Sequence, residues 1–494
     1  MIQTHHPDSF RTLAFSAACL VVAFLPGCHA PEAGHDPANF GQRTQSAPST
    51  APQVAVADSG ADAQQPETVP PAEDDFDLFE DEYENPKSDA APFDQNILDQ
   101  RVAWILPKVE EIRGMKFKHE VPAGLQSADQ FIDFAMDEFE HEYGFEEFAA
   151  MGEAYRLLGL IDPDMDLLET TMDLLKSQVG GYYDPKTKSF YMIDSFKQGA
   201  MADIILAHEL THALDDQVYD LQKMMSVAKD NADYEFAVRT VAEGSATSLM
   251  NLFAMKGLLG GWMEMDQESL AGMMGSQAEA IRDAPPFLII SLTLPYLEGN
   301  KFITREKDMI VATMAVPDNK DIDTVFANPP KSSEQVLHME KYWDPKQRDE
   351  PTLLELPDLS TELGEGWKLE SSNILGELGC FIMTEANIPD LTTAQGQISG
   401  KWTNDAASGW DGDRYQSYVG PDNARVLVWT TLWDSDEDAT EFYDALERPP
   451  HAGTPFLAAI QSAGSVVVVT YANEAGKKHV AKVMLDVPKI ERVP

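Results

Sequence analysis

The sequence contains Ala202-Asp-Ile-Ile-Leu-Ala-His208-Glu209-Leu-Thr-His212-Ala-Leu-Asp-Asp-Gln217, a run with the pattern His-Glu-x-x-His. Apolar residues recur in it at helical spacing and no Pro or Gly interrupts them, so the stretch predicts a buried helix. Residues four apart lie on one helical face, so His208 and His212 can point two imidazoles at a single ion. Glu209 lies beside His208, close to that ion without being needed as a ligand.

A buried helix whose histidines are satisfied by backbone groups or carboxylates is the alternative interpretation of this stretch. Two ionisable rings and a carboxylate are costly to bury on an apolar helix without a partner, which favours a metal site. Zinc in such a site lowers the pKa of a water molecule, and a neighbouring carboxylate accepts the proton. The expected cofactor is therefore Zn²⁺, with Glu209 as the base.

A third zinc ligand is expected downstream, because a catalytic zinc takes three protein ligands and keeps one position open. Residues 233–250 have a second helical pattern, in which Glu235 and Glu243 are the two candidates. Small residues flank Glu243 and let another helix approach closely, whereas Glu235 lies near the expected helix start, where a solvated acid is favoured. We therefore predict that Glu243 is the ligand.

Three more residues are expected to support the ligands without binding the ion. Arg239 precedes Glu243 by four residues and Thr247 follows it by four, so both share its helical face and can hold its carboxylate. Asp216, in the same predicted helix as the two histidines, is the third supporting residue.

The pattern His208-Glu-Leu-Thr-His212 followed by Glu243 resembles the gluzincin branch of zinc metallopeptidases. It also resembles a group of bacterial exported proteins that carry His-Glu-x-Thr-His-Ala-Leu-x-Asp-Gln and then Glu-Gly-x-Ala. The resemblance covers roughly residues 95–345. It implies a zincin-like, mainly helical peptidase domain whose substrate is a peptide or protein. Three features depart from the family. Glu243 follows His212 by 31 positions, more than in compact members, Ala242 precedes Glu243 where many gluzincins have Asn, and Thr247 stands where a carboxylate is often found.

The segment Gly180-Gly-Tyr-Tyr-Asp-Pro-Lys-Thr-Lys-Ser-Phe-Tyr191 resembles the strand pair that lies above a gluzincin cleft. Its composition predicts a hairpin over residues 179–194 with a turn at 184–188. The resemblance implies that the edge strand of this hairpin pairs with an extended peptide through main-chain hydrogen bonds.

A further helix start is expected at residues 328–342, with Ser332 or Ser333 near its N-cap. His338 and Tyr342, four residues apart, are expected to share a face. Because a gluzincin needs a donor for the oxyanion of the tetrahedral intermediate, His338 is the candidate for that role. The alternative is a histidine that fixes a helix–loop junction.

Residues 1–28 have the pattern of an export signal, with an apolar run at 13–25 that is too short to span a bilayer. The run ends in Leu25-Pro-Gly-Cys28, which resembles the lipobox of bacterial lipoproteins. This likeness implies that Cys28 is lipidated and that the lipid anchors an exported protein to a bacterial membrane, facing the periplasm or the exterior. The alternative is an ordinary cleaved signal peptide with an incidental Cys. Removal of the signal would leave Cys380 as the one other cysteine, so no disulfide framework is expected.

Charge and composition divide the rest of the chain. The 36 basic and 83 acidic residues give a formal net charge of −47, which disfavours nucleic acid and an anionic membrane surface as partners. Residues 29–92 predict a disordered acidic tether, and residues 93–350 the peptidase domain. Residues 351–494 contain strand-like runs at 425–433 and 465–471, which predict a smaller α+β domain with an antiparallel sheet that binds substrate or a partner.

The expected protein is thus an α+β, lipid-anchored zinc metallopeptidase that acts outside the cytoplasm. Two alternatives stay open. One is a zinc-stabilised envelope protein that acts in binding or assembly without significant hydrolysis, and the other is zinc-dependent hydrolysis of a non-peptide bond. Oligomeric state does not follow from the sequence.

Overall fold

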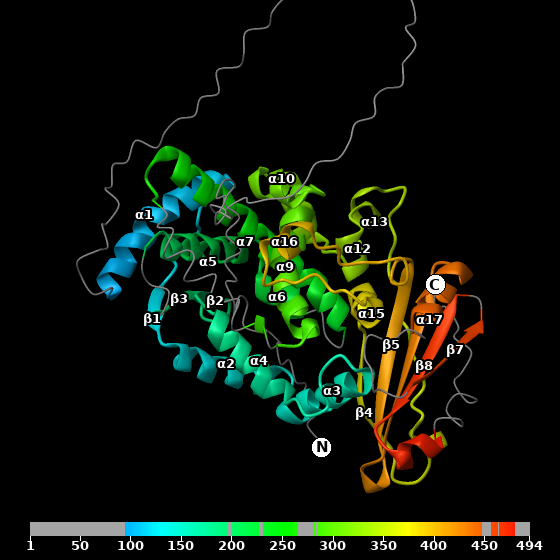
Figure 1. Ribbon diagram of the computed structural model, residues 1–494. Helices are drawn as coiled ribbons and strands as arrows, with labels where there is room; N and C mark the ends of the chain where they lie inside the picture. The colour runs from blue at the N-terminus through cyan, green and yellow to red at the C-terminus, as the bar shows by residue number, and fades with distance from the viewer. Residues whose placement is uncertain are drawn as a thin grey trace, which may run out of the picture. The chain divides into compact units, whose positions relative to one another are not determined.

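In the computed structural model (Figure 1), the helix that carries the His-Glu-x-x-His pattern is buried along most of its length. The structure describes residues 94–194, 199–226, 231–264, 281–282, 284–446, 456–462 and 464–479. The predicted export signal, the lipidation residue Cys28 and the predicted tether lie outside the described residues. Among the described helices, none combines the length and the hydropathy that crossing a bilayer requires.

Helix α5 (Gly199–Tyr219) confirms the helix predicted around the two histidines. Every residue from Met201 to Asp216 is buried, including both histidines and Glu209. Helix α7 (Ala232–Gly260) confirms the second predicted helix and continues ten residues beyond it. Asn231 is its N-cap and accepts a hydrogen bond from the backbone of Tyr234.

Helix α9 (Pro286–Thr304) packs against α7 through two glycines. A Cβ atom at Gly244 would collide with the backbone of Gly299, and one at Gly299 would lie 2.5 Å from the carbonyl oxygen of Thr240. The small residues around Glu243 therefore permit the close helix approach that the sequence predicts.

The elements that precede α5 are four helices and three strands in the described part of the chain. The helices are α1 (Gln95–Arg113), α2 (Ala128–Glu142), α3 (Phe145–Leu158) and α4 (Leu167–Gln178). The strands are β1 (Ala123–Gln126), β2 (Gly181–Asp184) and β3 (Ser189–Ile193), in the order β1-β3-β2. Strands β2 and β3 are antiparallel and confirm the predicted hairpin, while β1 pairs with β3 in parallel. Strand β2 is therefore an edge of this sheet, and it packs on α5.

Shorter helices lie between α5 and the C-terminal sheet, before or after the long helices α7 and α9. They are α6 (Leu221–Ser226), α10 (Met309–Met314), α11 (Asn319–Ala327), α12 (Ser333–Leu337), α13 (Glu340–Trp343) and α14 (Ser360–Leu363). Ser332 is the N-cap of α12 and accepts a hydrogen bond from the backbone of Gln335, which confirms the predicted cap.

The C-terminal region contains a five-stranded antiparallel sheet, drawn in yellow to red in Figure 1. Its strands, in spatial order, are β4 (Lys368–Asn373), β5 (Trp410–Val419), β6 (Arg425–Trp433), β8 (Ser465–Tyr471) and β7 (Phe456–Ser462). The helices here are α15 (Gly376–Thr384), α16 (Ala394–Ser399), α17 (Asp436–Leu446) and the 3₁₀ helix η2 (Pro421–Asn423). The predicted α+β character and antiparallel sheet are confirmed.

This sheet packs against the helices that precede α5. The hydroxyl of Thr470 in β8 donates a hydrogen bond of 2.8 Å to the carbonyl oxygen of Leu157 in α3. Tyr155 of α3 and Trp429 of β6 belong to one apolar core. All the described residues lie in one compact unit, so the regions on either side of residue 350 share buried contacts.

Candidate metal centre

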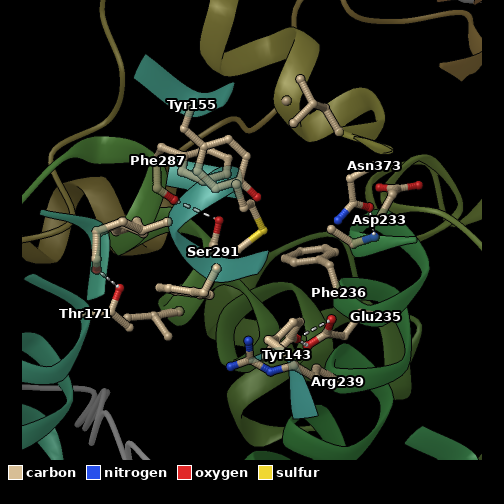
Figure 2. Close-up of a pocket in the computed structure, with 18 of the residues that line it drawn as sticks. Tyr143, Tyr155, Thr171, Asp233, Glu235, Phe236, Arg239, Phe287, Ser291 and Asn373 are labelled. Carbon is tan, nitrogen blue, oxygen red and sulfur yellow. Dashed lines mark hydrogen bonds between the residues drawn. The ribbon is translucent and has the colours of Figure 1, made fainter. Parts of the chain in front are cut away.

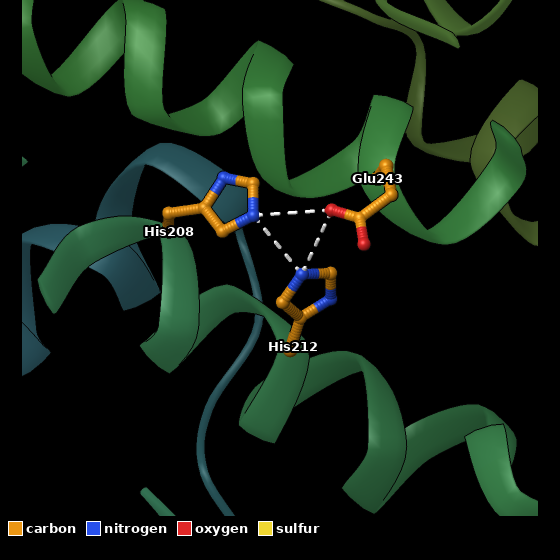
Figure 3. A group of neighbouring side chains, drawn as sticks. All are labelled: His208, His212 and Glu243. Atoms are coloured by element: carbon orange, nitrogen blue, oxygen red, sulfur yellow. Dashed lines mark hydrogen bonds and ion pairs between the residues drawn. The ribbon is translucent and has the colours of Figure 1, made fainter. Parts of the chain in front are cut away.

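Two nitrogens from α5 and one oxygen from α7 face a common point (Figure 3). The Nε2 atoms of His208 and His212 are 3.1 Å apart, and a Glu243 carboxylate oxygen lies 3.3 Å and 3.4 Å from them, respectively. Ligand atoms at about 2.0–2.1 Å from a tetrahedral zinc ion are separated from one another by about 3.3 Å. The three separations therefore fit one face of a zinc tetrahedron.

Burial makes this arrangement costly without a cation. Both histidines are fully buried, and Glu243 is 1% exposed. Two imidazole Nε2 atoms at 3.1 Å direct lone pairs toward each other unless a proton or a metal ion lies between them. The donor set of two imidazoles and one carboxylate is a set that zinc accepts, with a fourth position left open.

The three groups also influence one another's charge. Burial lowers the pKa of His208, because no solvent stabilises its cation. Burial opposes the charged form of Glu243 too, but the two imidazoles outweigh it and hold the pKa of this carboxyl at about 2. At His212, burial disfavours the cation, yet the carboxylates led by Glu243 raise the pKa of the ring. An ionised Glu243 is the form that a metal ion requires.

The predicted base, Glu209, is fully buried next to His208 on α5. Its charge is one of those that raise the pKa of His212, so the carboxylate acts on the ligand cluster. It is not one of the three residues whose ligand atoms converge. This position agrees with the prediction that Glu209 lies close to the ion without binding it.

The structure corrects the role predicted for Asp216. One of its oxygens accepts a hydrogen bond from the backbone of Leu221, and the other accepts from the Tyr183 hydroxyl and the Lys188 ammonium, both at 2.7 Å. Asp216 therefore ties the end of α5 to the β2–β3 hairpin and to α6. Its short contacts are with these groups rather than with the metal ligands.

The neighbouring Asp215, which sequence reasoning missed, joins the two helices that carry the candidate ligands. Asp215 is fully buried, and one oxygen accepts two hydrogen bonds from the guanidinium of Arg113. The other oxygen accepts a hydrogen bond of 2.6 Å from Ser245, two residues after Glu243. Its charge also helps to raise the pKa of His212. The available signal was its position three residues after His212, on nearly the same helical face.

Arg239 and Thr247 were both expected to hold the carboxylate of Glu243, and their surroundings in the structure are as follows. The carboxylate on which Arg239 acts in the described part of the chain is Glu235, whose pKa is raised by burial and lowered by this charge (Figure 2). Arg239 lines a pocket, and in the described part of the chain no hydrogen bond or ion pair joins it to Glu243, so its support of that carboxylate stays a prediction. Thr247 is buried, and its hydroxyl has no hydrogen-bond partner among the described residues. Support of Glu243 by Thr247 stays a prediction.

His338 lies at the C-cap of α12, where the backbone leaves the helical conformation. Tyr342 belongs to the separate helix α13, so the expected shared face does not exist. The Nε2 atom of His338 is 2.9 Å from a carboxylate oxygen of Glu377. Burial disfavours the imidazolium, but Glu377 raises the pKa of the ring. These contacts match the alternative of a histidine that fixes a helix–loop junction, and the oxyanion role has no support in them.

Tyr296 of α9 is a site neighbour that sequence reasoning missed. Its ring stacks on the imidazole of His208, with centroids 5.8 Å apart and ring planes 22° from parallel. The side chain is 2% exposed. No pattern in the sequence relates these two residues, because they are 88 positions apart on different helices.

A second group of acids, Glu334, Asp349 and Asp434, also brings carboxylate oxygens together. The ammonium of Lys341 donates hydrogen bonds of 2.6, 2.9 and 3.0 Å to these three carboxylates. A lysine thus supplies the cation here, and the group joins α12 to the end of β6. It is a structural cluster rather than a metal site.

The match to a known protein family lies in the C-terminal region of the chain. Residues 366–480 match a family model described as a domain of unknown function (DUF8575). The match contains the five-stranded sheet and none of the three candidate metal ligands. No curated protein and no solved structure matches the chain.

Proposed function

We propose that the protein is a zinc-dependent peptidase of the gluzincin type, with a zincin-like helical core. The observation that carries this proposal is the convergence of His208, His212 and Glu243, whose ligand atoms are 3.1–3.4 Å apart. These separations fit tetrahedral zinc, and the two histidines and the glutamate come from consecutive long helices, as in the resembling family.

Each residue has a distinct task in this proposal. Zinc, when bound, supplies a Lewis acid that lowers the pKa of water and polarises a carbonyl group. Glu209 accepts a proton from the water that attacks the peptide carbonyl and passes it to the leaving amine. Water thereby adds across the C–N bond, which gives a carboxylic acid and an amine. Asp215 and Ser245 hold α5 and α7 together beside the ligands.

Strand β2 supports the choice of a peptide as substrate. In the described sheet β2 has one neighbour, β3, and it packs on the helix that carries the histidines. An extended peptide binds to such an edge by adding a strand. We extend the proposal to the place of action, outside the cytoplasm and held to a bacterial membrane by a lipid on Cys28. Mass spectrometry of the N-terminal peptide from the native membrane tests the anchor.

The deciding experiment combines metal analysis with peptide cleavage. Purified protein is expected to contain one zinc per chain and to cleave members of a peptide library, and a chelator should abolish cleavage. Glu209→Gln should retain zinc and lose at least about a hundredfold in kcat, since general-base catalysis contributes 10²–10⁴-fold. Glu340→Gln, which removes a carboxylate on α13 that pairs with Lys307 at the surface, is the control and should retain zinc and activity.

Two outcomes would contradict the proposal. A chain that binds no zinc excludes the metal centre. A chain that binds zinc and cleaves no peptide, with Glu209→Gln indistinguishable from the parent in every property, supports the zinc-stabilised binding protein.

A further inference from the structure

Figure 2 shows an apolar pocket, of about 220 Å³, that is lined in part by residues of α7 and α9. The same two helices also contribute residues to the candidate metal centre. On α7, Phe236, Arg239 and Glu243 occupy positions i, i+3 and i+7, which lie on one face. Phe236 and Arg239 line the pocket, and Glu243 belongs to the metal centre. Because a helix rises 1.5 Å per residue, Arg239 lies about 6 Å along α7 from Glu243.

Helix α9 repeats this relationship. Leu288 and Leu292 line the pocket, and Tyr296, four residues further along the same face, stacks on His208. Both helices thus present pocket residues one turn before residues of the metal centre. Consecutive residues of an extended peptide are about 3.3 Å apart, so a group bound in the pocket and a bond held at the metal centre can belong to one short ligand.

One guanidinium, that of Arg239, belongs to the described lining of the pocket. Arg239 is half-buried and is the one cation among the described residues that line the pocket. In the described part of the chain it forms no hydrogen bond or ion pair, and Glu235 acts on it only through its charge. Both oxygens of Glu235 accept hydrogen bonds of 3.0 Å from the Tyr143 hydroxyl instead.

The other acids that line the pocket have partners of their own. Glu138 forms an ion pair with Lys186, and Asp233 accepts a hydrogen bond of 3.0 Å from the backbone of Ser333. A guanidinium is always charged, and its planar donors match a carboxylate. Arg239 is therefore the group in this pocket that a bound anion would pair with.

We propose that this pocket binds a carboxylate that carries a bulky apolar group. The carboxylate pairs with Arg239, and the apolar group lies among Phe236, Tyr155 and Phe287. Roughly 150 Å³ of apolar cavity is enough to take up benzene. The volume of about 220 Å³ here therefore holds an aromatic ring or a branched aliphatic chain.

The peptide form of this ligand rests on the proposed function. A ligand that reaches both the pocket and the metal centre is the C-terminal residue of a peptide, with its free carboxylate on Arg239. Hydrolysis of the preceding peptide bond releases that residue as a free amino acid, so the enzyme acts as a carboxypeptidase on apolar C-termini. A free apolar carboxylic acid has the same recognition chemistry, and the experiment separates the two sources.

Calorimetric binding to zinc-loaded Glu209→Gln protein tests the pocket without requiring turnover. The probes are acetyl-Gly-Phe with a free carboxylate, acetyl-Gly-Phe-amide and 3-phenylpropanoate. The free carboxylate should bind at least about tenfold more tightly than the amide, because it forms charge-assisted hydrogen bonds. Adding Arg239→Gln should make the two affinities equal, and Arg239→Lys should restore part of the difference.

Arg305→Gln is the matched control, because it removes a guanidinium at the end of α9 that pairs with Asp321 at the surface. This variant should keep the full preference for the carboxylate. Equal affinity for acid and amide in the Glu209→Gln parent would overturn the proposal. Tighter binding of 3-phenylpropanoate than of acetyl-Gly-Phe would overturn the peptide assignment. Failure of the active chain to cleave any peptide, with the carboxylate preference intact, would instead contradict the proposed function alone.

Discussion

Ser245 of α7 donates a hydrogen bond of 2.6 Å to the buried carboxylate of Asp215 on α5. Ser245 is two residues from Glu243, and Asp215 is three residues from His212. This contact therefore joins the two ligand-bearing helices next to the ligands themselves. We call this contact the Ser245–Asp215 brace, because it holds α5 and α7 together next to the candidate metal centre. The guanidinium of Arg113 in α1 donates hydrogen bonds to the other oxygen of Asp215.

Replacing Ser245 with Ala should lower zinc affinity by 10- to 100-fold, since residues that orient metal ligands typically contribute that much. The loss of a hydrogen bond to a buried charge should also lower the free energy of unfolding by about 1.5–3 kcal/mol. Competition with a chelator of known affinity measures the first effect. Ser248→Ala is the control, because Ser248 is buried on the same helix and its hydroxyl has no partner among the described residues. Equal losses in both variants would contradict a specific role for the brace.

Zinc removal should destabilise the folded chain. A ligand that binds only the native state adds about 4 kcal/mol of stability when its free concentration is a thousand times its Kd. Bound zinc would place a cation between the buried Nε2 atoms of His208 and His212, and this contact with the folded state alone is the reason why zinc should stabilise it. Thermal unfolding with and without added zinc measures the effect. A melting temperature that does not respond to zinc, or responds equally in His208→Gln, would contradict it.

The free energy of unfolding should depend on pH through the buried carboxyl group of Asp233. Burial, followed by the charges of Asp413 and Glu377, raises the pKa of this carboxyl from 3.8 to about 7. The folded state holds the proton more tightly, so the stability contributed by Asp233 is fully present below pH 3.8 and is lost as the pH rises toward 7. At 1.36 kcal/mol per pKa unit the loss reaches about 4 kcal/mol.

Thermal or urea unfolding between pH 4 and pH 8 measures this dependence in the parent and in Asp233→Asn. The parent should lose stability relative to the variant as the pH rises, because the amide does not titrate. Parallel curves for the two proteins would show that Asp233 does not titrate in this range.

Lys341→Met should destabilise the fold by about 3 kcal/mol, because it leaves Glu334 buried without its counter-charge. Asp349 and Asp434 lose the same partner. Lys307→Met is the control: it breaks an ion pair with Glu340 whose lysine is 78% exposed, and it should cost at most about 1 kcal/mol. Urea unfolding of both variants compares the two, and a similar small cost for each would contradict a structural role for the cluster.

Local regularities made much of this protein predictable. Spacings of a few residues predicted the α5 helix, the shared face of His208 and His212, and the β2–β3 hairpin. In regular secondary structure, such spacings determine the side to which each side chain points. The choice of Glu243 over Glu235 followed from the small residues around it, and the glycine contact with α9 gives the reason. The antiparallel C-terminal sheet followed from its β-branched and aromatic runs.

The identity of the partners, by contrast, depends on how the helices and strands pack together. Asp215 and Asp216 are adjacent in sequence, and packing alone determines that Ser245 reaches the first and the β2–β3 hairpin the second. The stack of Tyr296 on His208 and the turn of Arg239 into a pocket likewise depend on helices far apart in the chain. Which side chains share a helix face can be predicted from the order of residues alone, because it is a property of backbone geometry. Which element each face meets is set by long-range packing, and no local spacing encodes it.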